Sequence, residues 1–343
     1  MKTSSKTLLG GVLLAGSLVL AAAPGANAQL KEVRMMEAGG ASGDSIEAGY
    51  LKPFTEKTGI KVVRESPWSL GKLRGMVETG VITNAIVELD SLAMEQAKAL
   101  NLIETLDWKA INPEPIFDEA RQEKAIGYQY YSTLMAWRAD AKPVKTWQEF
   151  WDVKNFPGKR ALPNYPTYTL PIALLADGVK PENLYPLDIK RAFASLDKIK
   201  AHVSVWWEAG AQPPQLLKDN EVQYAVAWSG RVAGQKGISY TFENGLLDLA
   251  FFAIPRGASA EQKQAAYGIM HEMTVAKNQA VAAQVISYTG NSPALEPLLP
   301  QDRLNEFPTT SANKAVQSLP EPKWWFENAE LVEERWQEFK LGL

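Results

Sequence analysis

The sequence "IEAGYLKPFTEKTGIKVVRES", residues 46–66, predicts a helix and a strand in direct succession. Ile46, Tyr50, Leu51 and Phe54 fall on one helical face, which indicates a helix packed against a core. The run "IKVVRES" that follows is typical of a strand. A second strand-like run, "KEVRMMEA" at 31–38, precedes the helix. Strand, helix and strand in this order predict an α/β sheet.

The same alternation continues along the chain. "SLGKLRGMVETG" (69–80) reads as a helix, and "NAIVELD" (84–90) reads as a strand that ends at Asp90. "SLAMEQAKALNL" (91–102) has helical periodicity, with Ser91 as its predicted N-cap. In sheets of this kind, ligands bind beside the carboxyl ends of the strands.

A second region begins at "TWQEFWDVKNFPGKRAL" (146–162), where Thr146 is a predicted helix cap. Further strands are expected in "AVAWSGR" (225–231) and "DLAFFAIPRGAS" (248–259), and an aromatic-rich helix in the tail from 320. A chain of 343 residues exceeds what one hydrophobic core usually accommodates. Two lobes are therefore expected.

The overall composition excludes several classes of function. A net charge of −3 and a pI near 5.7 provide no basic field for nucleic acid or anionic lipid. The absence of cysteine excludes thiol catalysis, thiolate metal sites and a lipid-modified N-terminal cysteine. We expect no cofactor and no metal.

Residues 1–28 have the pattern of a signal peptide. Lys2 and Lys6 precede the apolar run "LLGGVLLAGSLVLAAA", and "ANA" at 26–28 is a small-residue cleavage site. Cleavage after Ala28 would release a periplasmic chain that begins at Gln29. The alternative is a retained anchor helix.

No catalytic motif is evident. The two histidines, His202 and His271, lack the spacing of a zinc-protease helix, and no nucleophile elbow or phosphate-binding loop is present. We therefore expect no enzymatic activity. A secreted hydrolase that uses a pair of carboxylates is the alternative from a different functional class.

"AVAWSGR" is the strongest candidate for a binding element. Trp228 can form an apolar wall for an organic ligand, and Arg231 can bind a carboxylate through two hydrogen bonds. Arg231 in a surface ion pair is the alternative. Trp68 and Trp207 also stand beside predicted turns, where they either contact ligand or fill the core of a lobe.

Two glycine-containing loops lead into helices. "GGASGDS" (39–45) offers backbone amides at a helix N-terminus, together with Ser42, Gly43 and Asp44. "AGAQPP" (209–214) forms a second such loop and contains Gln212.

These stretches resemble the periplasmic solute-binding proteins of ABC importers, in the branch of the spermidine/putrescine-binding proteins. The similarity extends over nearly all of the mature chain. It rests on "GGASGDSIEAGYLKPFTEKTGIKV", "NAIVELDSLAMEQAKALNLIETLDW", "TWQEFWDVKNFPGKRAL", "WWEAGAQPPQLLKDNEVQYAVAWSGR", "FFAIPRGAS" and "ISYTGNSPA".

The resemblance implies a type II periplasmic binding fold, in which each of two lobes has a mixed sheet flanked by helices and hinge strands join them. Lobe 1 would contain residues 29–137 plus 250–292, and lobe 2 residues 138–249 plus 293–343. It implies a monomer that captures a small molecule by hinge closure and delivers it to an inner-membrane ABC permease.

The ligand is expected to differ from a polyamine. Polyamine binders place an aspartate where this chain has Leu249 or Ala250, with Asp248 nearby, and an acid where it has Asn164 or Tyr165. Arg231 in the cleft favours a polar solute with a carboxylate or other anionic group, including a zwitterion. Asp90 or Asp44 could then meet its amine.

Two alternatives within the class stay open. One is a polyamine, and the other is ferric ion held by the tyrosines of "YQYY" (128–131). The predicted ligand-binding residues are Ser42, Gly43, Asp44, Trp68, Asp90, Trp207, Gln212, Trp228, Arg231 and Asn291.

Overall fold

The computed structural model describes residue 1 and residues 30–342. The predicted signal peptide beyond Met1 and its cleavage site lie outside the described residues. No helix in the described part of the chain is both long and apolar enough to cross a lipid bilayer.

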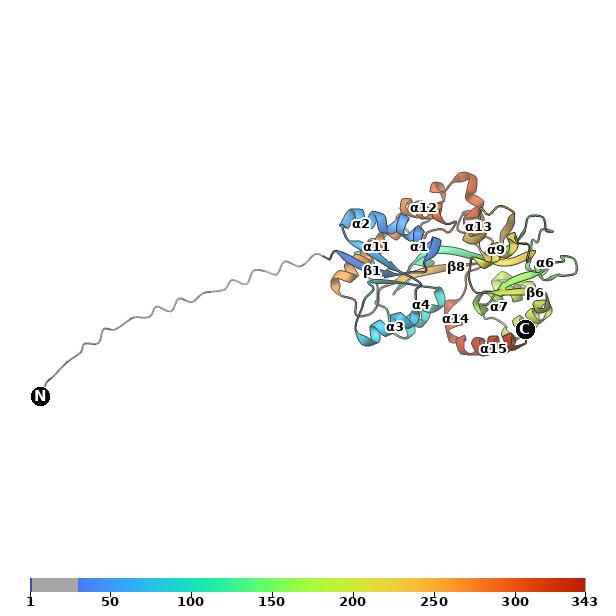
Figure 1. Cartoon of the computed structure of the whole chain (residues 1–343), viewed down its shortest axis with the longest axis horizontal. Helices are drawn as coiled ribbons and strands as arrows, with labels where there is room; N and C mark the ends of the chain where they lie inside the picture. The colour runs from blue at the N-terminus through green and yellow to red at the C-terminus, as the bar shows by residue number, and fades with distance from the viewer. Residues whose placement is uncertain (2–29, 343) are drawn as a thin grey trace. The chain divides into compact units, whose positions relative to one another are not determined.

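The centre of the structure is one eight-stranded mixed sheet with the order β2-β1-β3-β8-β4-β7-β5-β6 (Figure 1). β1 pairs in parallel with β2 and β3, and β5 pairs in parallel with β6 and β7. Between these groups, β8 runs antiparallel to both β3 and β4, and β4 runs antiparallel to β7. The strands are β1 (Glu32–Met36), β2 (Lys61–Glu65), β3 (Ile86–Leu89), β4 (Ile126–Arg138), β5 (Arg160–Pro163), β6 (Val203–Trp207), β7 (Tyr224–Trp228) and β8 (Ile238–Ala253).

Helices cover both groups of parallel strands. In Figure 1, α1, α2, α11 and α12 lie on one side of β1, and α3 and α4 lie on the other. The α-helices are α1 (Gly40–Ile46), α2 (Lys52–Thr58), α3 (Leu70–Thr79), α4 (Ser91–Ala99), α5 (Trp108–Ile111), α6 (Trp147–Trp151), α7 (Pro166–Ala176), α8 (Ile189–Ile199), α9 (Gln212–Lys218), α10 (Ser229–Val232), α11 (Ala260–Thr274), α12 (Ala276–Val285), α13 (Ser311–Lys314), α14 (Pro322–Glu327) and α15 (Ala329–Leu341). A π-helical turn, Glu47–Leu51, joins α1 to α2.

The helix predicted from residue 46 packs as its periodicity indicates. Ile46, Tyr50, Leu51 and Phe54 are all buried, with at most 2% of any of them exposed. Separate hydrophobic clusters lie at the two ends of the sheet, one around β1, β3 and α4 and another around α6, α7, α8 and α15. Burial of such apolar surface stabilises both ends. The division into two lobes at the predicted residue limits stays a prediction.

Three local expectations were wrong. The chain is already helical from Gly40, so most of "GGASGDS" is the first turns of a helix and not a loop. The N-cap of α4 is Asp90, whose Oδ1 accepts a hydrogen bond from the Ala93 N–H at 2.7 Å, while Ser91 is the first helical residue. The strand expected from Asp248 begins ten residues earlier, at Ile238, because it spans the sheet beside β4.

Candidate ligand-binding site

A cavity of about 270 Å³ lies where several strands end. Most of its lining residues lie at or shortly after the ends of β1, β2, β3, β5 and β7. The long strands β4 and β8 contribute Gln129, Tyr131 and Ala250. This is the position at which open α/β sheets bind ligands. Its lining residues are Ala38, Ser42, Trp68, Glu88, Asp90, Gln129, Tyr131, Tyr165, Thr167, Tyr168, Trp228, Arg231, Ala250 and Tyr288.

Trp228 is the centre of an aromatic group in this cavity. Its ring stacks on Tyr165, with centroids 6.4 Å apart, and meets the edge of Trp207 at 5.2 Å. Tyr131 and Tyr168 approach it at 6.3 and 6.2 Å. The backbone of Gly210 lies so close to the indole that a Cβ there would collide with the ring. The tryptophan is therefore held in one orientation.

Two buried N–H donors of the cavity residues have no partner. The Nε1 of Trp228 and the Nε of Arg231 form no hydrogen bond within residues 30–342. Arg231 lies beside Tyr288: burial raises the pKa of Tyr288 to about 12, and the nearby guanidinium limits that rise. A buried donor without a hydrogen-bond acceptor costs free energy. These two N–H groups are therefore suited to bind an acceptor on a ligand.

The acidic residues of the cavity are Glu88 and Asp90. Glu88 is 4% exposed and accepts hydrogen bonds from the Ala38 N–H at 2.6 Å and the Tyr128 hydroxyl at 2.9 Å. Burial raises the pKa of Glu88 to about 7, because the charged form is desolvated. Burial also raises the pKa of Asp90. An ammonium group would offset the cost of ionising either carboxyl.

A third carboxyl, Asp248, lies directly behind the cavity wall. It pairs with Tyr131 in the β4–β8 register and accepts a hydrogen bond from the Tyr131 hydroxyl at 3.0 Å. The Tyr131 and Tyr168 hydroxyls are 3.1 Å apart, so both tyrosines are tied to this acid. Burial raises the pKa of Asp248 to about 6. Asp248 therefore adds a third carboxyl next to the cavity, beside Glu88 and Asp90.

Half of the predicted binding residues line the cavity. They come from α1, from the turn before α3, from the end of β3 and from the end of β7. These residues are Ser42, Trp68, Asp90, Trp228 and Arg231.

The other predicted residues lie elsewhere, each for a local reason. Asp44 is exposed and forms an ion pair with Arg64, and Gly43 packs against that arginine. Trp207 is fully buried and donates to the Val226 carbonyl. Gln212 accepts hydrogen bonds from the backbone of the preceding turn, and Asn291 is buried and donates to the Gly127 carbonyl.

Sequence reasoning missed most of the tyrosines and one acid. Tyr131, Tyr168 and Tyr288 line the cavity, as do Glu88 and Gln129. One signal was available: in "YQYY", alternation along a strand places Gln129 and Tyr131 on one face. The tyrosines on the other face donate to Glu88 and Glu119. Among residues 30–342, no group of three or more histidine, aspartate and glutamate side chains is placed to hold a metal ion.

Comparisons with known proteins place the chain in a family. Residues 49–306 match the family described as bacterial extracellular solute-binding protein. The γ-aminobutyric acid-binding protein of Pseudomonas aeruginosa is 32% identical, covering 92% of this chain and 93% of the relative. An ABC transporter substrate-binding protein from Bradyrhizobium japonicum is 34% identical with a TM-score of 0.84, covering 90% of this chain and 99% of that chain. The GABA receptor Atu4243 is 28% identical with a TM-score of 0.82, covering 90% and 97%.

These relatives confirm the type II periplasmic binding fold and the resemblance to ABC importer proteins. They bind solutes and are not enzymes, so the hydrolase alternative is wrong. The chain therefore belongs to the bacterial extracellular solute-binding protein family, and it is a substrate-binding protein of an ABC transporter.

Proposed function

We propose that the protein binds a small zwitterion of the ω-amino acid class, such as γ-aminobutyrate. The observation that carries this proposal is one small cavity with unpaired donors on Arg231 and Trp228 and with carboxyls on Glu88 and Asp90. Arg231 would bind the carboxylate of the ligand, and the carboxyls of Glu88 and Asp90 would bind its ammonium group. Trp228 and the tyrosines would enclose the methylene chain.

A polyamine fits this arrangement less well. Both ends of putrescine are cations, and one of them would lie beside Arg231 in a partly desolvated cavity. A relative that is 32% identical is a γ-aminobutyric acid-binding protein, which supports a ligand with one charge of each sign.

Capture would proceed by hinge closure about β4 and β8. The proposed lobes are residues 29–137 plus 250–292 and residues 138–249 plus 293–343, and ligand contacts from both would favour the closed state. We further propose that the chain is cleaved after Ala28, acts as a periplasmic monomer and delivers its ligand to an inner-membrane permease. The other predicted residues outside the cavity would support its walls.

A calorimetric and thermal-shift panel tests the ligand class. The mature chain is titrated with γ-aminobutyrate, 5-aminovalerate, butyrate, butylamine, putrescine and spermidine. We expect saturable binding and a raised Tm with the two amino acids, and much weaker effects with compounds that carry one kind of charge. Binding of putrescine and spermidine without binding of the amino acids would contradict the proposal.

The pH dependence of ligand binding should follow the protonation of the Glu88 carboxyl. Because the pKa of this carboxyl is raised to about 7, it is protonated below that pH and no longer offsets an ammonium group. We expect the affinity for γ-aminobutyrate to fall by up to about tenfold per pH unit from pH 7 to pH 6. Isothermal titration calorimetry across pH 6–8 measures the effect.

The matched variant is Glu88→Gln, which keeps the shape of the side chain. It should bind γ-aminobutyrate weakly and with little dependence on pH over this range. A variant with the same pH profile as the wild type would show that another group controls the titration.

A further inference from the structure

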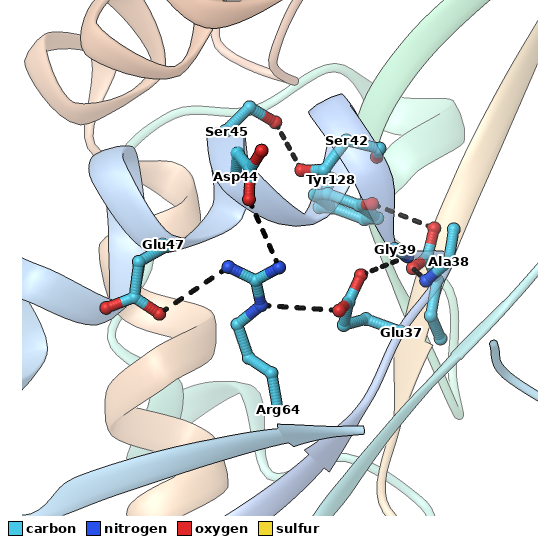
Figure 2. Close-up of polar contacts among 10 residues, drawn as sticks. Glu37, Ala38, Gly39, Ser42, Asp44, Ser45, Glu47, Arg64 and Tyr128 are labelled. Atoms are coloured by element: carbon cyan, nitrogen blue, oxygen red, sulfur yellow. Dashed lines mark hydrogen bonds and ion pairs between the residues drawn. The ribbon is translucent and has the colours of Figure 1, made fainter. Parts of the chain in front are cut away.

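A partly buried ion pair lies close to the cavity without lining it. Glu37, which follows β1 and is 1% exposed, accepts a hydrogen bond from the Nε of Arg64 on β2 at 3.3 Å (Figure 2). Neither residue lines the cavity. The side chain of Arg64 is 25% exposed, whereas that of Glu37 is almost fully buried. Removal of Arg64 would leave the Glu37 carboxylate buried without its cation, which is unfavourable.

Glu37 holds the turn that enters the cavity. Its other carboxylate oxygen accepts a hydrogen bond from the Gly39 N–H. The residue between them, Ala38, lines the cavity and donates its own N–H to Glu88 at 2.6 Å. One short turn, Glu37 to Gly39 in Figure 2, therefore joins the ion pair to Glu88, the carboxyl that we assign to the ligand ammonium.

Arg64 holds the first helix that follows this turn. Besides Glu37, its guanidinium contacts Asp44 on α1 at 3.4 Å and Glu47 in the π-helical turn at 3.9 Å. Gly43 leaves room for the pair: a Cβ there would lie 2.5 Å from Glu37 Oε2 and 2.6 Å from Arg64 Nη2, so both side chains would have to shift. The pair thus fills the space directly under α1.

The helix carries a cavity residue on its other side. The Ser42 hydroxyl donates to Gln129 Oε1 at 2.7 Å, and both residues line the cavity. The amide of Gln129 donates in turn to the Ser45 hydroxyl at 3.2 Å. The first turn of α1 is therefore held between β4 on one side and the Arg64–Glu37 pair on the other.

We propose that Arg64 and Glu37 are positioning residues of the ligand cavity, which keep the Ala38 N–H on Glu88 and keep Ser42 at the cavity wall. The role of Glu88 in this inference rests on the proposed function. The effect of the pair on the positions of the turn and of α1 is independent of the proposed function.

The pair also has an electrostatic consequence at Glu88. Burial is the main cause that raises the pKa of Glu88; the hydrogen bonds from Tyr128 and Ala38 oppose it, and the charges of Glu37 and Asp90 add to it. Arg64 offsets the charge of Glu37. Removing Arg64 should therefore raise the pKa of Glu88 further, while removing the charge of Glu37 should lower it.

Two variants that break the Arg64–Glu37 ion pair from opposite sides distinguish a positioning role from a purely structural one. Arg64→Met should weaken γ-aminobutyrate binding about threefold to tenfold at pH 7.5, the loss of about one hydrogen bond, and move the midpoint of the pH profile upward. Glu37→Gln should move that midpoint downward. Arg64→Lys and the double variant Arg64→Met/Glu37→Gln should have midpoints near that of the wild type.

The control is Arg34→Met, which removes another sheet arginine whose only described ion pair is with Glu65 at 3.7 Å. It should bind with unchanged affinity and pH midpoint. Equal shifts in the same direction for Arg64→Met and Glu37→Gln, or no shift in either, would overturn the proposal.

A ligand-free measurement decides the positioning role even if γ-aminobutyrate does not bind. Hydrogen exchange at the Ala38 and Gly39 amides should be faster by about tenfold in Arg64→Met and unchanged in Arg34→Met. Unchanged protection at both amides would show that the pair does not hold the turn. Failure of the wild type to bind any amino acid, with the exchange result intact, would instead contradict only the proposed function.

Discussion

Replacement of Arg231 with methionine is expected to weaken γ-aminobutyrate binding at least about a hundredfold. The guanidinium is the cation of the cavity whose Nε lacks a partner within residues 30–342. Methionine retains the aliphatic volume but cannot bind a carboxylate. Isothermal titration calorimetry at pH 7.5 measures the change.

Two comparisons make this result specific. Arg335→Met, at an exposed position on α15, should bind as the wild type does. Butylamine lacks a carboxylate, so its weak binding should be the same or tighter in Arg231→Met. Full affinity of Arg231→Met for γ-aminobutyrate would show that Arg231 does not bind the ligand carboxylate. A gain of putrescine binding in this variant would support the proposed charge pattern.

Trp228→Ala should have the second largest effect, on both stability and binding. The indole packs against Tyr131, Tyr165, Tyr168 and Trp207, and truncation would leave a cavity among these rings. We expect a loss of about 3 kcal/mol in the free energy of unfolding. Binding should weaken by more than about tenfold, because the wall against the methylene chain is lost.

Trp228→Phe separates the ring from its N–H group. Phenylalanine keeps an aromatic wall but has no donor, so we expect a decrease in affinity of about threefold to tenfold, typical of one hydrogen bond. Urea unfolding and calorimetry measure the two effects independently. Equal affinities of Trp228→Ala and the wild type would place the ligand away from this wall.

The elements that sequence predicts well are those decided by local periodicity. The helix that contains Tyr50 and Phe54 shows its buried face in a window of a few residues, and the family resemblance supplied the fold class. The order of the eight strands in one continuous sheet was not predicted. The long strand β4 was not expected, because its residues are nearly all buried and show no alternation of polar and apolar side chains. Its partners, β7 and β8, lie about a hundred residues away in sequence.

The residues of the candidate site also differ in how far local sequence predicts them. Asp90 and Arg231 were found because they stand where predicted strands end. Gln129 and Tyr131 lie within the long strand β4, and only the pairing register brings them into the cavity. Sequence also could not distinguish Trp228, which lines the cavity, from Trp207, which is packed behind it, because both follow apolar runs.

The central position of β8 has a consequence for the order in which the chain can fold. β3 hydrogen-bonds to Phe251–Ala253, so the sheet that begins with β1 stays incomplete until that late segment has been synthesised. Pairing between such distant segments is slow to form. The sheet can therefore be completed only after the chain has been synthesised as far as Ala253.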